Sequence, residues 1–230
     1  RKILVSIYVN PKQFNKLSDY KSYPRNLIKD IGMLKKININ YLFLPSEKDI
    51  YTFKTSNKIF MDKFSKQLCG KFRKDHFRSV IDVVNRFLEI IEPKYIFLGL
   101  KDFQQLYLIK KHILKRKIST KVIECKTVRE KNGVACSSRN INLSDKDIKI
   151  ASKIYYYLYN LKKKLKTNFN SVQINKIKKY IYDLGVDKIE YVQYININNS
   201  QIIKKKNKTN KQYKMFIAYY LKKVRLIDNI

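Results

Sequence analysis

The chain has 230 residues, enough for one large domain or two small ones, and its 51 Lys and Arg against 18 Asp and Glu give a formal net charge of +33. The basic residues are spread along the chain among abundant Asn, Ile and Tyr, the residues of A/T-rich codons, which favours a biased genome over a dedicated polyanion-binding surface. The three cysteines lack CxxC spacing and no apolar run approaches the ~18 residues of a membrane span, which argues against a zinc site, a disulfide scaffold and a transmembrane protein, and favours the reducing cytoplasm.

The first predicted element is a buried strand over Ile3–Val9. A turn at Asn10 and Pro11 follows and places Gln13 at the carboxyl end of that strand. Because the chain opens with Arg1 and enters a strand almost at once, we expect an upstream piece of the domain to be missing from this sequence.

Helical and strand patterns then alternate along the first half of the chain. They are a helix over Leu27–Leu34, a strand over Tyr41–Leu44, a weak edge strand over Asp49–Ser56, a short helix over Phe60–Leu68 capped by Gly70, a long helix over Val80–Ile91 stopped by Pro93, a strand over Tyr95–Leu98, a helix over Gln104–Lys115 and a strand over Lys121–Glu124. Strands joined through helices imply right-handed parallel crossovers, so the pattern predicts an open parallel α/β sheet.

The turn Gly99–Gln105 joins a predicted strand to the next helix and so lies at the carboxyl edge of the sheet. The free N–H groups and the dipole of a helix N-terminus favour an anion there, which makes Lys101 a candidate phosphate ligand; the alternative is a solvated lysine. Asp102 and Gln105 have the spacing of a capping box, and the local pattern alone favours this cap over a ligand role.

The character of the sequence changes near residue 126, which predicts an α/β domain over residues 1–126 and a smaller α+β domain over residues 127–230. A polar loop over Lys126–Asn140 comes first, and Ser144–Asp147 is predicted to cap a long helix. The later elements are a helix over Val172–Leu184 ending at Gly185, strands over Ile189–Ile197, Met215–Tyr220 and Val224–Ile227, and a solvated Lys/Asn-rich loop over Lys204–Lys214.

Several segments, in this order, resemble the pantothenate synthetase family along nearly the whole chain. They are Val5–Phe14, Tyr23–Arg25, His76-Phe77, Gly99–Gln105, Thr127–Glu130, Ser137–Asn140 and Val224–Asn229. The resemblance implies a Rossmann-like open parallel sheet of the HIGH-type nucleotidyltransferase superfamily with a smaller α+β lid domain, in a cytoplasmic homodimer. It also implies an AMP-forming ligase: the carboxylate of pantoate attacks ATP to give pantoyl adenylate and pyrophosphate, and the amine of β-alanine then displaces AMP.

The resemblance further implies roles for individual residues. Gln13 and Gln105 would bind pantoate, and Gln13 would also bind β-alanine. Asp102 would contact Mg²⁺, the cofactor that accompanies ATP. The implied ATP-binding set is Gly99, Leu100, Lys101, Asp102, Val128, Cys136, Ser137, Ser138 and Arg139, and the implied catalytic set is Lys101, Ser137, Ser138 and Arg139. Displacement at phosphorus depends on positioning and charge neutralisation, which suits Lys101 and Arg139 on opposite sides of the triphosphate.

The sequence also departs from the family pattern. The family's first strand and its His-containing phosphate loop have no counterpart here, so we expect a protein made only of these residues to bind ATP poorly. Leu100 stands where the family usually has Glu, Ser79 where Gly is usual, and Cys136 where Met or Leu is usual. His76 matches a family position near β-alanine, with no chemical role assigned. Two other interpretations stay open, a basic nucleic-acid-binding protein and a truncated relative that folds without catalysing.

Overall fold

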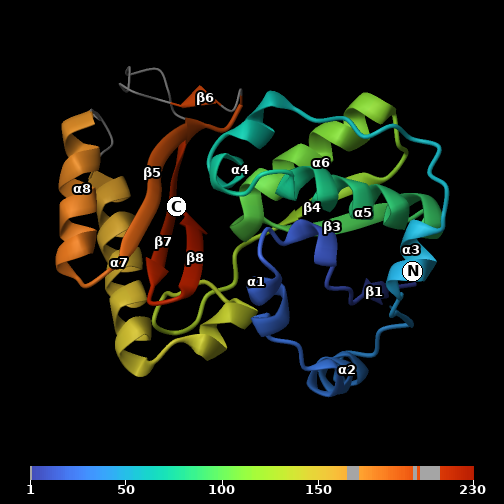
Figure 1. Cartoon of the computed structure of the whole chain (residues 1–230), viewed down its shortest axis with the longest axis horizontal. Coiled ribbons are helices and arrows are strands. Elements are labelled where there is room, and N and C mark those ends of the chain that lie inside the picture. Colours follow the sequence, from blue (N-terminus) through green and yellow to red (C-terminus); the bar gives the residue numbers. More distant parts are fainter. Residues whose placement is uncertain (1, 165–170, 199–200, 203–212) are drawn as a thin grey trace.

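The computed structural model describes residues 2–164, 171–198, 201–202 and 213–230. Figure 1 shows an N-terminal half that holds the parallel strands, beside a C-terminal half in which an antiparallel sheet packs against two long helices. Within the described ranges, no helix has both the length and the apolar character needed to cross a membrane.

The N-terminal half alternates short strands with helices, as predicted. Its elements are β1 (Leu4–Ser6), η1 (Pro11–Gln13), α1 (Leu17–Ser22), α2 (Leu27–Lys36), β2 (Tyr41–Phe43), α3 (Glu47–Tyr51), η2 (Lys63–Lys66), α4 (Cys69–Phe72), α5 (His76–Ile91), β3 (Tyr95–Gly99), η3 (Leu100–Asp102), α6 (Phe103–Arg116) and β4 (Lys121–Cys125). β1 pairs in parallel with β2, and β3 pairs in parallel with β4, which confirms the predicted parallel pairing. Among the described residues, hydrogen bonds join these strands into two separate two-stranded sheets.

The prediction of a buried first strand is wrong in its burial and its length. β1 covers three residues, and Leu4 is 39% exposed. The reason is that β1 has a hydrogen-bonded neighbour on one edge only, so its side chains contact less of the protein than those of a central strand.

Two helices predicted from apolar periodicity form the core of this half. α5 buries Val80 and Leu88, and α6 buries Ile109 and Ile113, in one apolar cluster. These spacings place the apolar side chains on one face of each helix. α5 ends where Glu92 adopts a left-handed conformation just before a proline.

Two predictions between β2 and α5 are wrong. Asp49–Ser56 was predicted as an edge strand, but α3 occupies part of it, because the Ser46 hydroxyl accepts from the Asp49 N–H at 3.3 Å and the Asp49 carboxylate accepts from the Ser46 N–H at 2.7 Å. Phe60–Leu68 was predicted as one helix ended by Gly70; the chain instead forms η2 and α4, with Gly70 inside α4. A Cβ atom on Gly70 would clash with the Ser65 carbonyl oxygen, so close packing explains this glycine.

The C-terminal half is an antiparallel sheet in the order β6-β5-β7-β8. Its elements are η4 (Ser138–Asn142), α7 (Asp145–Lys164), α8 (Ser171–Asp183), β5 (Lys188–Asn196), β6 (Gln201–Ile202), β7 (Tyr213–Leu221) and β8 (Val224–Asn229). The predicted cap of α7 is confirmed, because the Ser144 hydroxyl accepts from the Asp147 N–H at 3.3 Å and the Asp147 carboxylate accepts from the Ser144 N–H at 3.1 Å. Gly185 follows α8 with a φ of +98°, as expected of a residue that ends a helix. Residues 203–212, most of the predicted Lys/Asn-rich loop, lie outside the described residues.

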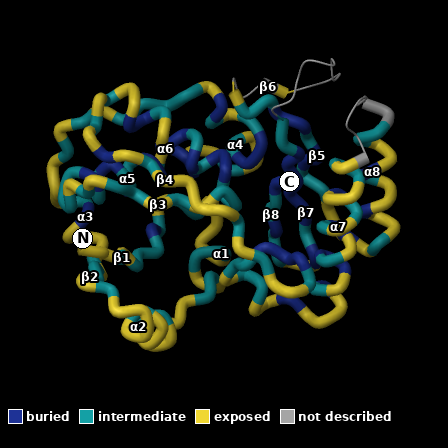
Figure 2. Tube along the Cα trace, turned by 180° about the vertical axis from the view of Figure 1, so that it is seen from behind, coloured by how far each residue is buried: buried dark blue, intermediate teal, exposed yellow. Residues whose placement is uncertain are grey.

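One apolar cluster joins the two halves, and we call it the shared core. Its N-terminal members are Phe64, Leu68, Cys69, Phe77, Ile81, Phe103 and Leu108, and its C-terminal members are Tyr191, Ile195, Phe216 and Ala218. Figure 2 shows these buried stretches of β5 and β7 beside the buried parts of α4 and α6. The division into domains at residue 126 stays a prediction.

Candidate active site

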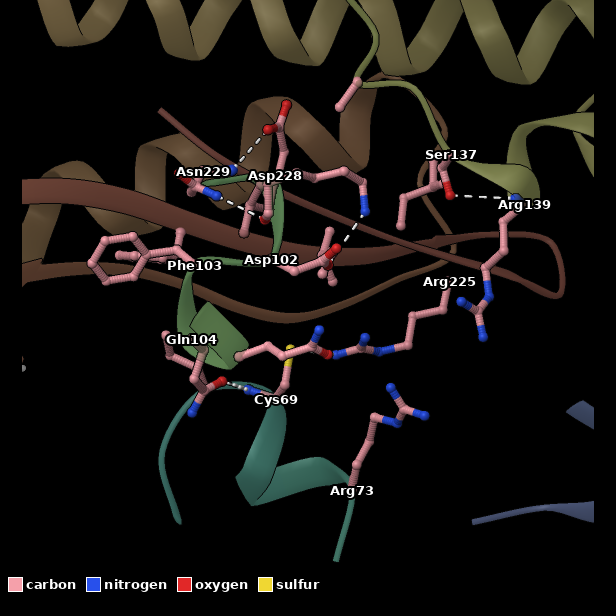
Figure 3. Close-up of a pocket in the computed structure, with 18 of the residues that line it drawn as sticks. Cys69, Arg73, Asp102, Phe103, Gln104, Ser137, Arg139, Arg225, Asp228 and Asn229 are labelled. Carbon is pink, nitrogen blue, oxygen red and sulfur yellow. Dashed lines mark hydrogen bonds and ion pairs between the residues drawn. The ribbon is translucent and has the colours of Figure 1, made fainter. Parts of the chain in front are cut away.

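A cavity of about 510 Å³ lies between the two halves, within the usual size of small-molecule sites. It brings together eight of the residues that the sequence singled out: Gln13, Lys101, Asp102, Gln105, Cys136, Ser137, Ser138 and Arg139. Of the remaining predicted residues, Gly99, Leu100 and Val128 do not line it, and Val128 is 70% exposed. Figure 3 shows the labelled side chains entering the cavity from β8, α4, the turn before α6 and the loop before η4.

The turn between β3 and α6 presents its charged residues to the cavity. Lys101 Nζ lies 3.4 Å from Asp102 Oδ1. The capping box predicted for Asp102 is absent, because the Asp102 side chain makes no capping hydrogen bond to α6. Its carboxylate is 47% exposed and therefore free to contact a ligand.

Gln13 is positioned through its backbone. The Gln13 carbonyl oxygen lies 2.8 Å from His76 Nδ1 and accepts from Arg73 Nη2 at 3.1 Å. Asn10, which is 1% exposed, caps η1 by accepting from the Lys12 N–H at 3.1 Å. The Gln13 side chain is thereby held at the cavity wall.

His76 is neutral in this arrangement. Its Nδ1 must donate to the Gln13 carbonyl, and its Nε2 must accept from Arg73 Nη1 at 3.2 Å, so the geometry requires the Nδ1–H tautomer. Burial and the adjacent Arg73 lower the pKa of His76 to about 3. His76 therefore orients Gln13 and carries no charge at neutral pH.

The start of η4 is docked onto the N-terminal half. The Ser138 hydroxyl donates to the Tyr23 hydroxyl at 3.0 Å, and Arg139 Nη2 lies 3.2 Å from an Asp19 carboxylate oxygen. The Ser137 hydroxyl accepts from the Arg139 N–H at 3.3 Å. These contacts bring the Arg139 guanidinium to the same cavity as Lys101.

Two arginines in the cavity were not predicted as site residues. Arg225, from β8, contacts Glu190 at 2.7 Å and Cys69 Sγ at 3.4 Å. Arg73 has no ion pair with an acidic side chain among the described residues, and burial together with the nearby Arg225 lowers its pKa. No local pattern marks either residue as a ligand, because each reaches the cavity only through the tertiary fold.

The described residues contain no cluster of three or more His, Cys, Asp or Glu side chains that could hold a metal ion. Cys69, Cys125 and Cys136 are unbridged in this structure. Two carboxylates line the cavity, those of Asp102 and Asp228, and Asp228 is paired with Arg129 at 2.7 Å.

The parallel strands, each followed by a helix, are those of a Rossmann-like fold, and the structural neighbours given below identify it as the fold of the HIGH-type nucleotidyltransferase superfamily. The family model described as pantoate-beta-alanine ligase matches residues 1–230. The chain belongs to this family of AMP-forming ligases, which confirms the resemblance predicted from the sequence.

Individual relatives agree with this assignment. Pantothenate synthetase from Flavobacterium psychrophilum is 38% identical over 229 residues, which cover 99% of this chain and 81% of that protein. The enzyme from Francisella tularensis subsp. mediasiatica is 38% identical over 230 residues, covering 99% and 78%. The structure of Francisella tularensis pantoate-beta-alanine ligase complexed with Beta-gamma ATP and β-alanine has a TM-score of 0.81 at 37% identity and covers 100% of this chain and 79% of that one. Pantothenate synthetase from Thermus thermophilus shares the fold, with a TM-score of 0.89 at 24% identity, over 100% of this chain and 83% of that one.

Proposed function

We infer that this chain catalyses the ATP-dependent condensation of pantoate with β-alanine, through a pantoyl adenylate, with release of pyrophosphate and AMP. Membership of the pantoate-beta-alanine ligase family supports the reaction. The observation that carries the residue assignment is the single cavity that gathers Gln13, Lys101, Gln105 and Arg139 from segments far apart in the sequence.

We assign Lys101 and Arg139 to the triphosphate of ATP. Attack of a carboxylate on the α-phosphorus builds negative charge on the departing pyrophosphate, and fixed cations stabilise that charge. Ser137 and Ser138 stand beside Arg139 and add hydroxyl donors. Arg139 is paired with Asp19 in this structure, so binding of phosphate would replace a half-exposed ion pair, which contributes at most about 1 kcal/mol.

Asp102 is the residue that we assign to Mg²⁺. Its carboxylate lines the cavity, makes no capping bond and has the oxygen donors that this ion prefers. When bound, Mg²⁺ neutralises phosphate charge and so eases loss of pyrophosphate.

Gln13 and Gln105 are assigned to pantoate, since amides both donate to a carboxylate and accept from hydroxyls. β-Alanine adds a second carboxylate. It is best bound by a positively charged side chain that is not already in an ion pair with an acidic residue. Arg73 meets this requirement and holds the backbone of Gln13, so we place the β-alanine carboxylate at Arg73.

The adenine side is assigned to the rim of the cavity. Gly99, Leu100 and Val128 lie outside its lining and would act through their backbone, and Cys136 supplies an apolar surface inside it. The free cysteines fit a reducing cytoplasm, and a homodimer remains the expected assembly.

The test of the function, made on the full-length protein, is ATP–pyrophosphate exchange that depends on pantoate, followed by AMP release that depends on β-alanine. We expect Lys101→Ala to lower exchange roughly 10²- to 10³-fold, the usual effect of removing one group that stabilises developing charge. Lys110→Ala is the matched control, because Lys110 of α6 pairs with Glu124 of β4 at 2.9 Å and lies outside the cavity. Exchange without pantoate, or none at all, would contradict the proposal.

The nucleic-acid interpretation is not favoured. The family assignment covers the whole chain and supplies anionic substrates for the cations that line the cavity. Tight, salt-dependent binding of duplex DNA without thermal protection by ATP and pantoate would restore that interpretation. A chain that folds but shows no exchange would support the inactive relative.

A further inference from the structure

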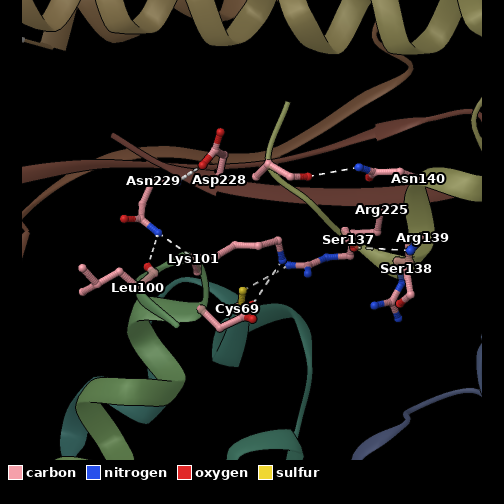
Figure 4. A network of polar contacts seen from close by, with 12 residues as sticks. Cys69, Leu100, Lys101, Ser137, Ser138, Arg139, Asn140, Arg225, Asp228 and Asn229 are labelled. Atoms are coloured by element: carbon pink, nitrogen blue, oxygen red, sulfur yellow. Dashed lines mark hydrogen bonds and ion pairs between the residues drawn. The ribbon is translucent and has the colours of Figure 1, made fainter. Parts of the chain in front are cut away.

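The last strand reaches the phosphate turn through one side chain, Asn229. Its Nδ2 donates to the carbonyl oxygens of Leu100 at 2.8 Å and Lys101 at 2.9 Å (Figure 4). Asn229 is 4% exposed, so competition from water for these two bonds is weak. A residue of the C-terminal sheet thus holds the backbone of the turn from which Lys101 enters the cavity.

The orientation of this amide is determined by its partners. Two carbonyls require a donor, while Lys214 Nζ, at 2.9 Å from Asn229 Oδ1, requires an acceptor, so nitrogen and oxygen cannot be exchanged. The Asn229 N–H donates to Asp228 Oδ1 at 2.8 Å, and Asp228 pairs with Arg129 at 2.7 Å. Asn229 is therefore held in place both through its side-chain amide and through its backbone N–H.

We propose that Asn229 is a positioning residue for the adenylation step. By binding two consecutive carbonyls it fixes where the turn Leu100–Asp102 places the Cα atom of Lys101. The lysine side chain is flexible, so the position of its ammonium group depends on that anchor. Asn229 is neutral, which makes its contribution geometric and separable from charge. This inference rests on the proposed phosphate role of Lys101.

The first test compares Asn229→Ala with Asn85→Ala. Asn85 is a matched control: it is 0% exposed, its Oδ1 lies 3.0 Å from His112 Nε2, and it lies outside the cavity. Both substitutions remove a buried amide and lower the melting temperature. We expect only Asn229→Ala to raise KM for ATP, roughly 10- to 100-fold, with KM for β-alanine unchanged, since a small misplacement of a binding group is this costly. Equal effects of the two variants would overturn the proposal.

A second test does not depend on turnover. Amide hydrogen exchange in a peptide covering Gly99–Gln105 should become faster in Asn229→Ala and in Asn229→Leu, which keeps a branched side chain and adds no charge. It should stay unchanged in Asn85→Ala. Unchanged exchange in both Asn229 variants would overturn the proposal. Absence of ATP–pyrophosphate exchange in the unaltered chain would instead refute the proposed function, and the amide measurement would still decide whether Asn229 holds the turn.

A double-mutant cycle completes the test. If Asn229 acts through Lys101, Asn229→Ala should change KM for ATP far less in a Lys101→Ala background than in the unaltered chain. Additive effects of the two substitutions would show that Asn229 acts by another route and would overturn the proposal.

Discussion

The stability of this protein should depend on pH through His112, which is buried at the centre of a hydrogen-bond network. Its Nδ1 accepts from the Phe60 N–H at 3.2 Å, so Nε2 must carry the proton that faces Asn85 Oδ1 at 3.0 Å. Asn85 Nδ2 in turn donates to Glu89 at 2.8 Å. Protonation of His112 at Nδ1 would place its new N–H group directly opposite the Phe60 N–H, so that this hydrogen bond would be lost. The test is to replace His112 with Gln, which cannot titrate.

The magnitude follows from the pKa. Burial and the nearby Arg116 lower the pKa of His112 from 6.5 to about 4. In the unfolded chain His112 therefore binds a proton near pH 6.5, whereas in the folded chain it binds one only near pH 4. Above pH 6.5 His112 does not lower the stability. As the pH falls from 6.5 toward about 4, the free energy of unfolding declines by up to about 3 kcal/mol.

Urea unfolding between pH 7.5 and pH 4.5 measures this effect, at roughly 1.4 kcal/mol per pH unit for each proton bound on unfolding. The chain has two histidines, His76 and His112, and both have a lowered pKa when folded, so unfolding below pH 6.5 takes up a proton on each, and His112→Gln should remove one of these two contributions to the slope. We expect His112→Gln to lower stability at pH 7.5, because the Phe60 N–H loses its partner, and to reduce the slope below pH 6.5. Equal slopes in the two proteins would refute the reasoning.

Three further substitutions test the site and its supports. Arg73→Gln should raise KM for β-alanine roughly 10- to 100-fold in steady-state assays, because it removes a charged hydrogen bond to one carboxylate. It should raise KM for pantoate by a smaller factor, because the Gln13 carbonyl loses Arg73 but keeps His76 as a partner. Asp228→Asn should lower the free energy of unfolding in urea by roughly 1 to 3 kcal/mol, because it leaves the half-buried Arg129 guanidinium without its charged partner. Gly133→Ala should lower the melting temperature, because this glycine has a φ of +83° and a Cβ would clash with the Tyr155 ring, whereas Gly32→Ala, with open space around it, should not.

Much of the fold was predictable because the signals are local. The helix over Val80–Ile91 and the strand over Tyr95–Leu98 follow from periodicity and from Pro93, and the structure places α5 and β3 there. The cap of α7 by Ser144 and Asp147 was also predictable from the sequence. Ser46 and Asp49 form the same capping pair, and it starts a helix in a segment whose weak alternation predicted a strand.

The site was predictable only where a local turn or a family motif marks it. The pattern at Gly99–Gln105 led to Lys101. For Asp102 the local pattern favoured a cap and the resemblance implied a ligand, and the structure shows no cap. The sequence assigns no role to Arg73, and Arg225 lies in the family segment Val224–Asn229, to which no site role was attached. Their place in the cavity depends on how α4 and β8 pack across the shared core, and no local pattern encodes that packing.

The shared core also determines how substrates can enter. Separating the two halves would expose side chains such as Phe216 and Tyr191 to water. This exposure costs roughly 1.5 to 3 kcal/mol of free energy for each large apolar side chain. The segment Ser137–Arg139 is held mainly by a hydroxyl contact to Tyr23 and an ion pair to Asp19, and detaching it costs far less. Substrates should therefore enter the cavity when the segment Ser137–Arg139 detaches, while the contacts of the shared core stay intact.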